Sequence, residues 1–386
     1  MNAQFDVAII GGGPVGAALA LALRGSELKV CVLEARPADT ASQDARALAL
    51  SYGSRLLLAR LGVWDALHDV SAIRTIHISQ KQSFGRAVLR AAELNVPELG
   101  YVLPYPALQD ALTVALRSSD VESVCGASVT RLNTSNGQAM IGYHQDGVER
   151  ILHARLAVVA DGGKLLAQQF PPEVHDYGQS ALVTHITCSA PQPNTAYERF
   201  TPQGPLALLP FNVGYELVLT APHQVAQEML ACDDAKFLQE LHQHFGDRVG
   251  EFLSVGKRSC FPLGLRRAPK QTPMQHTVLL GNAAQTMHPV AGQGFNMGLR
   301  DAWELGQEML DAEPEALGTE TMLATYRADR RTDREMGIRF TDGLVRLFSN
   351  DLPLVSAGRA AALTALDCLP FAKKFVAKRM MFGANG

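Results

Sequence analysis

Two glycine-bearing segments near opposite ends of the chain constrain its fold more than any other feature. The first is Gly11-Gly12-Gly13-Pro14-Val15-Gly16. The second is Gly281-Asn282-Ala283-Ala284, closely followed by Pro289-Val290-Ala291-Gly292-Gln293-Gly294-Phe295-Asn296. Glycine lets the backbone approach a ligand closely, because it has no Cβ atom to intrude. We therefore expect these distant segments to meet in space around one extended cofactor.

The first segment lies inside a predicted strand, helix and strand. Residues 5–10 form a short apolar, β-branched run, which is typical of a buried strand. Residues 14–23 are apolar and alanine-rich with proline at the first helical position, and they predict a helix. Residues 29–34 predict a second strand, which ends in Glu34. This order and length are typical of a dinucleotide-binding βαβ unit.

The three spaced glycines have separate roles in such a unit. Gly11 makes the tight turn, Gly13 admits a pyrophosphate, and Gly16 lets the helix pack closely on the strand. The helix N-terminus stabilises the diphosphate, and Glu34 is placed to accept hydrogen bonds from a ribose. The sequence therefore predicts dinucleotide binding.

The middle of the chain changes character. Extended patches separated by turn residues lie between 180 and 221, as in an antiparallel sheet, and 226–245 predicts one helix. A strand over 277–280 and a helix over 294–310 then return to the earlier pattern. We therefore expect a discontinuous cofactor fold with a sheet domain inserted in its middle.

Later segments favour FAD over NAD as the cofactor. Asp161-Gly162 follows a further predicted strand, and Gly292-Gln293-Gly294 opens a helix. Backbone N–H groups and the positive end of that helix would stabilise the negative charge of a reduced flavin. Either segment alone would be only a turn, but an NAD-dependent dehydrogenase has no use for residues 281–296.

Composition limits the class of protein. The 386 residues, 47% hydrophobic and 19% charged, suit a soluble globular protein of two or three domains. A net charge of −3 gives no attraction to nucleic acid. The six cysteines are dispersed, which predicts neither disulfides nor a metal site and fits a reducing compartment. Without a recognisable signal peptide or membrane span, we expect a cytoplasmic location.

Taken together, these motifs resemble the FAD-dependent aromatic hydroxylases of the p-hydroxybenzoate hydroxylase fold. That family combines an N-terminal glycine motif, a mid-chain Asp-Gly and a Gly-Asp motif that runs into Pro-x-x-Gly-Gln-Gly-x-Asn. Asp44-x-Arg46-x-x-Ala49-Leu50 resembles the family's arginine segment near the flavin, and Gln109 matches a helix residue that reaches the cofactor. The cofactor-binding residues that the resemblance implies are Gly11, Gly13, Gly16, Glu34, Arg46, Gln109, Asp161, Gly162, Gly281, Asn282, Gly292, Gln293, Gly294 and Asn296.

The resemblance covers essentially the whole chain and implies its architecture. The expected fold is α/β, with a Rossmann-like FAD-binding domain of the glutathione-reductase type, an inserted antiparallel-sheet substrate domain and C-terminal helices. The implied division is 1–75, 100–179 and 270–342 for the FAD-binding domain, 76–99 and 180–269 for the substrate domain, and 343–386 for the C-terminal region.

Within the family, the chain is most similar to the ubiquinone-biosynthesis branch. Residues 281–296, Arg199-Phe200-Thr201 and 204–210 carry this similarity. It implies hydroxylation of a polyprenylated methoxyphenol, 2-octaprenyl-6-methoxyphenol, to the 1,4-benzoquinol. The family's Gly-Asp is Gly281-Asn282 here, and the asparagine can still accept a hydrogen bond through its carbonyl oxygen.

The resemblance also implies the reaction. NADPH or NADH reduces FAD transiently, and O2 adds to give a C4a-hydroperoxyflavin that hydroxylates the ring para to the phenol. The candidate catalytic residues are His288, Pro289 and Arg46, with His185 a weaker candidate. His288 is either a base for the phenol or a structural histidine. Arg46 either touches the substrate or neutralises phosphate and shapes the pocket.

The C-terminal region allows two interpretations. No acidic residue follows Asp367, and basic residues alternate with aromatic ones up to Phe382. The helix either packs on the body or docks on a membrane surface or on other ubiquinone-biosynthesis proteins.

Residues 206–211 are expected to form one wall of a groove for the polyprenylphenol. The arginines at 327, 330, 331 and 334, mixed with acids, predict a solvated helix face.

Other functions stay open at this stage. A polyprenyl reductase or a halogenase has the same cofactor fold, although neither Trp64 nor Trp303 lies in the W-x-W-x-I-P segment of halogenases. Another ring hydroxylase of the same pathway would share every motif. A flavin-bearing scaffold in a biosynthetic complex is the non-enzymatic alternative.

Overall fold

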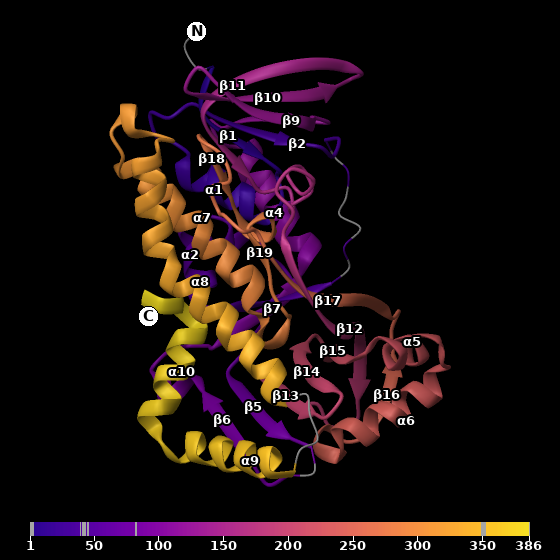
Figure 1. Ribbon diagram of the computed structural model, residues 1–386. Helices are drawn as coiled ribbons and strands as arrows, with labels where there is room; N and C mark the ends of the chain where they lie inside the picture. The colour runs from indigo at the N-terminus through magenta and orange to yellow at the C-terminus, as the bar shows by residue number, and fades with distance from the viewer. Residues whose placement is uncertain are drawn as a thin grey trace.

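The computed structural model describes residues 4–38, 40, 44, 46–81, 83–348 and 353–385. Residues 1–3 and 386, at the ends of the predicted domain ranges, lie outside this part. The strands form three sheets, and the long helix α8 (Glu320–Phe348) runs from the half of the molecule around β1 to the half around β13 (Figure 1).

The first sheet contains the N-terminal βαβ unit at the expected residues. Strands β8, β2, β1 and β11 are parallel neighbours, β18 pairs in parallel with the end of β11, and β10 and β9 continue the sheet antiparallel. Ile10 pairs with both Leu33 and Val159, so three strands end side by side. The strands are β1 (Phe5–Ile10), β2 (Val30–Glu34), β8 (Glu122–Cys125), β9 (Ser128–Ser135), β10 (Gln138–Gln145), β11 (Val148–Val159) and β18 (Thr277–Leu279).

The continuous apolar run of β1 is explained by burial on both faces. Val7 and Ile9 pack with helices, whereas Ala8 and Ile10 pack with the antiparallel strands β9 and β10. Successive side chains of a strand point to opposite faces, so a strand buried on both faces is apolar throughout. The helices on the first face are α1 (Pro14–Leu23), α4 (Tyr105–Arg117) and α7 (Gln293–Asp311).

The second sheet is mainly antiparallel and has nine strands. Their order is β19-β17-β12-β15-β14-β13-β5-β6, and β16 pairs with β12. Strands β5 and β6 thus join the mid-chain strands, although the domain boundaries stay a prediction. The strands are β5 (Thr75–Gln80), β6 (Arg86–Arg90), β12 (Glu173–Cys188), β13 (Thr195–Thr201), β14 (Gly204–Phe211), β15 (Gly214–Pro222), β16 (Phe252–Val255), β17 (Ser259–Arg267) and β19 (Gln285–Thr286).

Two helices, rather than the single one expected over 226–245, cover one face of this sheet. They are α5 (His223–Ala231) and α6 (Asp234–Phe245). The expectation of one helix was wrong because Asp233 begins a new one, its side chain accepting a hydrogen bond from the Lys236 N–H at 2.8 Å. The opposite face of the sheet is left for a cavity.

A small third sheet connects the two larger ones. Strand β7 (Gly100–Pro104) pairs antiparallel with β3 (Ala47–Ser51) and β4 (Ser71–Ile73). The short helix α2 (Tyr52–Arg60) follows β3 directly, and α3 (Ala91–Leu94) follows β6. Because β3 is tied to α7, this sheet brings an N-terminal segment to the C-terminal glycine segment.

The C-terminal helices pack on the body. Helices α9 (Pro353–Cys368) and α10 (Pro370–Phe382) lie against the β5–β6 end of the second sheet (Figure 1). Lys373 is buried and pairs with Asp367 at 3.0 Å. Phe371 and Phe375 point to solvent, with 72% and 57% of their surfaces exposed. No helix in the described ranges is long and apolar enough to cross a membrane.

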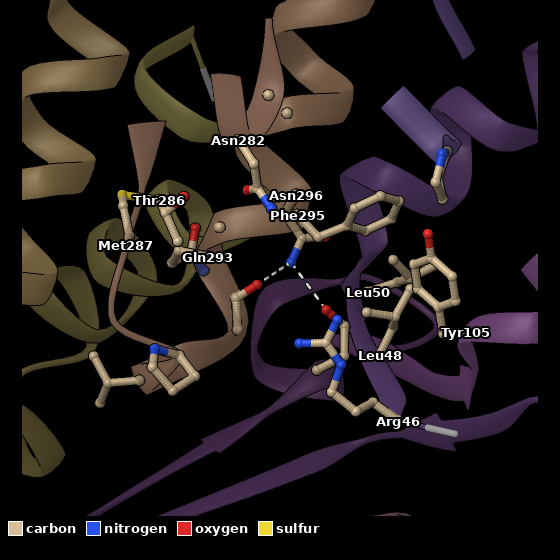
Figure 2. A pocket seen from close by; sticks show the side chains of 18 of the residues that line it. Arg46, Leu48, Leu50, Tyr105, Asn282, Thr286, Met287, Gln293, Phe295 and Asn296 are labelled. Atoms are coloured by element: carbon tan, nitrogen blue, oxygen red, sulfur yellow. Dashed lines mark hydrogen bonds between the residues drawn. The ribbon is translucent and has the colours of Figure 1, made fainter. Parts of the chain in front are cut away.

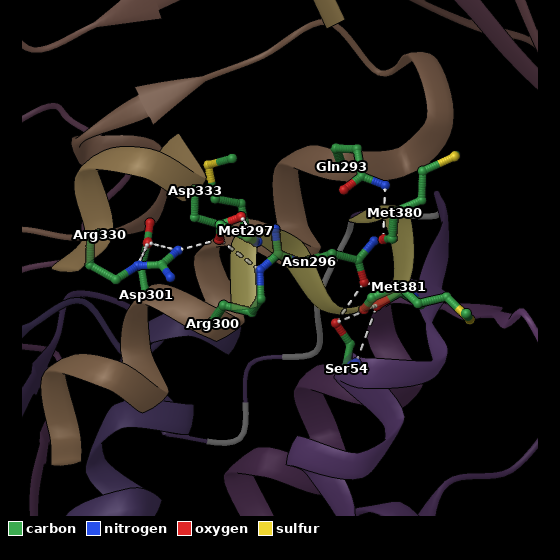
Figure 3. Close-up of polar contacts among 12 residues, drawn as sticks. Ser54, Gln293, Asn296, Met297, Arg300, Asp301, Arg330, Asp333, Met380 and Met381 are labelled. Atoms are coloured by element: carbon green, nitrogen blue, oxygen red, sulfur yellow. Dashed lines mark hydrogen bonds and ion pairs between the residues drawn. The ribbon is translucent and has the colours of Figure 1, made fainter. Parts of the chain in front are cut away.

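The arginine-rich part of α8 does not form the solvated face that the sequence predicted. Arg330 is only 2% exposed and pairs with Asp301 at 2.7 Å and Asp333 at 2.6 Å, as Figure 3 shows. Arg331, the next residue, does face solvent and pairs with Glu335. The expectation was wrong for Arg330 because the partner Asp301 lies on α7, which charge counting along one helix does not reveal.

Candidate active site

One cavity of about 1350 Å³ extends from the carboxyl ends of the first sheet to the open face of the second. It exceeds the roughly 300–1,000 Å³ that is usual for pockets of drug-sized ligands. Arg46, Tyr105, Asn282 and Phe295 reach it from four separate positions along the chain, and Figure 2 shows them around the same space. Such a volume fits two ligands placed end to end.

The N-terminal glycine turn is shaped for a ligand at one position only. A Cβ atom at Gly11 would lie 2.6 Å from the Ala160 carbonyl oxygen, and one at Gly16 would collide with the Gly11 carbonyl. These two glycines therefore serve packing within the protein. A Cβ atom at Gly13, by contrast, would meet no protein atom within 4 Å. The open space at Gly13, beside the first turn of α1, fits the pyrophosphate of FAD.

Glu34 is held as a carboxylate next to this turn. It accepts hydrogen bonds from the Gly12 N–H at 2.7 Å and from the backbone and side chain of Arg36 at 2.9 Å. Burial raises the pKa of Glu34, but the bonds and charge of Arg36 outweigh it, so the pKa lies below its ordinary value. Glu34 lines the cavity with its charge in place, as a ribose contact requires.

The C-terminal glycine segment forms the opposite wall of the same cavity. It consists of the short helix η3 (Gly281–Ala283), the short helix η4 (Val290–Gly292) and the start of α7. Gly292 has a φ of +60° and caps α7, so the first N–H groups of this helix are available at the cavity. Both glycine segments therefore meet at one site, as the sequence predicted.

Asn296 holds this segment against β3. Its Oδ1 accepts hydrogen bonds from the Ser51 N–H at 2.8 Å and the Ser54 hydroxyl at 2.7 Å, and its Nδ2 donates to the Ala49 and Gly292 carbonyls (Figures 2 and 3). All four bonds are to protein groups. Asn296 thus positions Gly292 within the cavity wall, and its contact with the cofactor stays a prediction.

Two further predicted cofactor residues support loops around the site. Gln109 is buried and donates through Nε2 to the Gly12 carbonyl at 3.1 Å, so it steadies the glycine turn from behind. Asp161 accepts hydrogen bonds from three backbone N–H groups, including that of Gly163 at 2.8 Å. Gly162, next to it, has a φ of +79°, which suits glycine. Asp161 and Gly162 line the cavity, whereas Gln109 does not.

Asn282 and Gln293 differ in how they face the cavity. Asn282 is exposed to it, and no hydrogen bond of its side chain is found within the described residues. Its amide fits the role of an acceptor or donor for the cofactor. Gln293 instead donates a hydrogen bond to the Met380 carbonyl of α10 at 3.3 Å. This bond joins α10 to the C-terminal glycine segment. Gly294, beside it, also lines the cavity.

Arg46 and Pro289 lie where the first part of the cavity meets the second sheet. The guanidinium of Arg46 pairs with Asp44 through its Nε at 2.7 Å and lies 5.3 Å from the centre of the Phe261 ring. The side chain of Arg46 is half exposed, so it can reach a ligand in the cavity. Pro289 lines the same junction and is exposed to it.

His288 is placed differently from these two residues. It is 1% exposed, does not line the cavity, and contacts the Tyr177 ring edge-on at 5.4 Å. Its Nδ1 accepts a hydrogen bond from the Val290 N–H at 3.2 Å. Burial lowers the pKa of His288 to about 4, so the imidazole is neutral at physiological pH. This placement favours the structural interpretation of His288 over the catalytic one.

The buried neutral imidazole of His288 makes stability depend on pH. Above the ordinary pKa of 6.5 both the folded and the unfolded states are neutral. As the pH falls, the unfolded state gains a proton that the folded state does not take until about pH 4, so stability decreases. At pH 5 this group should lower the free energy of unfolding by about 2 kcal/mol relative to pH 7.5.

Denaturant unfolding at these two pH values tests this expectation. His288→Asn, which can still accept from the Val290 N–H, should show the smaller decrease. His68 is exposed, so His68→Asn should show the wild-type decrease. His77, whose pKa is also lowered to about 4 by burial and by Arg248, contributes equally in every variant. Identical losses in wild type and His288→Asn would contradict the assignment.

The sequence did not reveal most of the second half of the cavity. Its walls include Glu198 and Phe200 from β13 and apolar side chains of α9 and α10. Apolar residues at helical spacing in these helices, such as Leu363 and Leu366, predict that one face is buried. They do not predict which part of the molecule that face contacts. Within 206–211, Ala207 and Leu209 do line the cavity, as expected for one wall of a groove.

The geometry defines a class of protein before any comparison. A glycine turn open at Gly13, a carboxylate at Glu34 and the N-terminus of α7 surround one elongated cavity whose far half lies on an antiparallel sheet. This is the arrangement of an FAD-dependent aromatic hydroxylase. The described residues contain no group of three or more His, Cys, Asp or Glu side chains suited to a metal ion.

Comparison with known proteins agrees with this class. The family described as FAD binding domain matches residues 4–341, and the chain belongs to this family of FAD-dependent monooxygenases. It is 32% identical to ubiquinone hydroxylase UbiL of Rhodospirillum rubrum, over 97% of this chain and 89% of that protein. It is also 32% identical to 3-demethoxyubiquinol 3-hydroxylase of Escherichia coli, over 95% of each.

Solved structures share the fold at lower identity. A p-nitrophenol 4-monooxygenase from Pseudomonas putida matches with a TM-score of 0.79 and 17% identity over the whole of both chains. PqsL of Pseudomonas aeruginosa matches with a TM-score of 0.76 and 20% identity, over 94% of this chain and 99% of that one. The predicted fold class and the identification of a flavoprotein monooxygenase are therefore confirmed.

Proposed function

We propose that this monooxygenase hydroxylates the ring of a polyprenylated methoxyphenol in ubiquinone biosynthesis, converting 2-octaprenyl-6-methoxyphenol to the 1,4-benzoquinol. The similarity to ubiquinone hydroxylase UbiL and to 3-demethoxyubiquinol 3-hydroxylase supports the pathway. The observation that carries the proposal is the apolar second half of the cavity, which continues beyond the cofactor segments. A simple phenol has no need of this space.

The second half of the cavity fits a prenyl chain. It lies between the open face of the second sheet and the helices α8, α9 and α10. Burial of apolar surface contributes about 25 cal/mol per Å², so a chain of isoprene units would gain affinity along the whole of this wall. Its apolar lining residues include Ile76, Ile78, Leu89, Ala207, Leu209, Leu344, Leu363, Leu366, Val376 and Met380.

The residues of this chain prepare the site for oxygen transfer. Bound FAD supplies the redox chemistry, for which we propose NADPH or NADH as the transient reductant and O2 as the co-substrate. The N–H groups at the start of α7 stabilise negative charge next to Gly292. The apolar walls from the second sheet exclude water, and a chain anchored along them orients the ring. Arg46 and Pro289 flank the junction where the ring would lie.

Turnover of defined substrates tests the function. The FAD-loaded enzyme should convert a short-chain 2-prenyl-6-methoxyphenol, with NADPH and ¹⁸O2, into a quinol that carries one labelled oxygen atom. The same phenol without the prenyl group should react with a KM at least about tenfold higher, since it leaves the apolar wall uncovered. The product would be identified by mass spectrometry and by comparison with synthetic ring isomers.

Three outcomes of this assay would contradict parts of the proposal. If labelled product forms only from a 3-demethoxyubiquinol-type substrate, the proposed pathway stands, but the proposed ring position is wrong. FAD binding without any product, or with H2O2 only, would favour the flavin-bearing scaffold. Equal KM values with and without the prenyl group would refute the role of the apolar wall.

We also propose peripheral membrane contact through α10. Phe371 and Phe375 are exposed beside Lys374 and Lys378, on the helix that forms the end wall of the cavity. Basic and aromatic residues together favour the surface of an anionic bilayer. Supplying the prenylphenol in anionic vesicles lets sedimentation of the enzyme be measured in the same samples, and absence of sedimentation would refute the contact.

A further inference from the structure

The carboxyl group of Glu198 lies on the cavity face of the second sheet without a partner. Glu198 is in β13 and lines the cavity. Within the part of the chain that the structure describes, its side chain has no hydrogen bond and no ion pair. Its carboxyl oxygens are therefore available to a ligand that enters the cavity.

The side chains next to Glu198 on this face are apolar. Ile78 of β5 and Ala207 of β14 pair with it directly, and Val218 of β15 pairs with Ala207. All three line the cavity. Side chains two residues apart in a strand share a face, so Ala196 and Phe200 flank Glu198 along β13. A carboxyl group in these surroundings cannot satisfy its hydrogen-bonding capacity within the protein.

The flanking residues show which part of the cavity Glu198 faces. Phe200 packs in one cluster with Val290, which belongs to the flavin segment η4. Ala196 packs in another cluster with Val102 and partly buried Ala47, the first residue of β3. Glu198 therefore lies between two contacts that join this sheet to the cofactor segments. Its carboxyl group lines the cavity on the stretch of sheet between these two contacts.

Burial has a marked effect on this group. It raises the pKa of Glu198 to about 8, with no charged neighbour contributing. Glu198 is half-buried and lines the cavity, and a carboxyl group with a shifted pKa at a cavity wall is a candidate functional group. A pKa near neutrality also suits a group that exchanges a proton with a phenol, because its two forms are both accessible.

We propose that Glu198 binds the phenol hydroxyl of the substrate and takes its proton during hydroxylation. This inference rests on the proposed function. The proton passes from the phenol oxygen to the carboxylate, and the oxygen lone pair strengthens the attack of the para carbon on the oxygen that comes from O2. One oxygen atom forms the new C–O bond, and the other leaves as water. The reduced nicotinamide supplies the two electrons. The ring C–H proton is lost as aromaticity returns, and Glu198 gives its proton back to the quinol.

Few other titratable groups face Glu198. The neighbouring side chains from β5 and β14, Ile78 and Ala207, do not titrate, and neither does Val290 of η4, which packs with Phe200. Glu216, on the same face across β14, is paired with His185 at 3.0 Å. On the side of η4, Tyr177 donates to Asp342 at 3.2 Å and contacts neutral His288. A rate that rises with pH as the carboxylate forms is therefore assigned to Glu198.

Glu198→Gln removes the acid while keeping the size of the side chain. In the wild type, kcat/KM for the short-chain 2-prenyl-6-methoxyphenol should rise as the pH increases through about 8, as the proportion of carboxylate increases. The variant should lose this rise, and its kcat/KM at pH 8.5 should fall about 10²-fold. FAD binding and thermal stability should be retained, because the replaced group has no hydrogen bond or ion pair with any described residue.

A binding measurement separates this inference from the proposed function. Oxidised holoenzyme is titrated, following the flavin absorbance, with the phenol and with its O-methyl ether. The wild type should bind the phenol about tenfold or more tightly than the ether, and Glu198→Gln should bring the ratio close to one. Glu216→Gln, whose carboxylate is engaged by His185, should keep the wild-type ratio.

The possible results are distinguishable. If the wild type makes no hydroxylated product, the proposed function fails, and the phenol-to-ether ratio still decides whether Glu198 recognises the hydroxyl. If the wild type makes product and Glu198→Gln keeps both the pH profile and the ratio, the inference is overturned. Failure of the wild type to bind either compound overturns both proposals.

Discussion

Arg330→Met is expected to lower the free energy of unfolding by about 3–5 kcal/mol, the cost of breaking a buried ion pair by removing one partner. The guanidinium of Arg330 donates to Asp301 through Nε at 2.8 Å and to Asp333 at 2.6 Å. Asp301 is 0% exposed, so the variant would leave its carboxylate in the interior without this cation. Methionine fills similar volume, so the loss would report the charge rather than a cavity. Guanidinium unfolding followed by circular dichroism measures it.

The adjacent residue offers a matched control. Arg331 is on the same helix, and its side chain is 76% exposed in an ion pair with Glu335. Exposed pairs of this kind contribute about 0–1 kcal/mol, so Arg331→Met should change the free energy of unfolding very little. Equal losses in the two variants would show that the buried cluster does not join α7 to α8 as the structure indicates.

Gly13→Ala is expected to weaken FAD binding at least about tenfold while leaving the apoprotein folded. Gly13 has a φ of −65°, which alanine adopts without strain, and its added Cβ would meet no protein atom within 4 Å. The methyl group would instead occupy the open space next to the start of α1, where we expect the pyrophosphate to lie. Titration of the apoprotein with FAD, followed by flavin fluorescence, measures the change.

Two other glycines frame this result. Gly358 in α9 is exposed and also has open space at its Cβ position, so Gly358→Ala should bind FAD as the wild type does. Gly16→Ala should lose stability as well as FAD binding, because its Cβ collides with the Gly11 carbonyl. Wild-type affinity in Gly13→Ala would mean that the diphosphate does not approach this residue.

The features predicted correctly from sequence are those that depend on neighbouring residues. The strand 5–10 and the helix 14–23 follow from periodicity, proline and glycine within a few positions, and the helix expected over 294–310 begins one residue earlier, at Gln293. We expected the two glycine segments to meet because an extended cofactor is too long to be bound by one of them alone. The predicted cofactor residues stay a prediction, although the structure places most of them on one cavity.

What the sequence by itself determined was the class of fold and the two glycine segments that line one cavity. Glycines there are required by backbone geometry, which is a local property. Only the tertiary structure decided that Arg330 is buried, that α9 and α10 close the cavity, and that Glu198 faces the cavity with no partner among the described residues. These three features depend on which side chains of other helices and strands lie next to the residues concerned. Burial and the absence of a partner are properties of the packed chain, and no spacing along it encodes them.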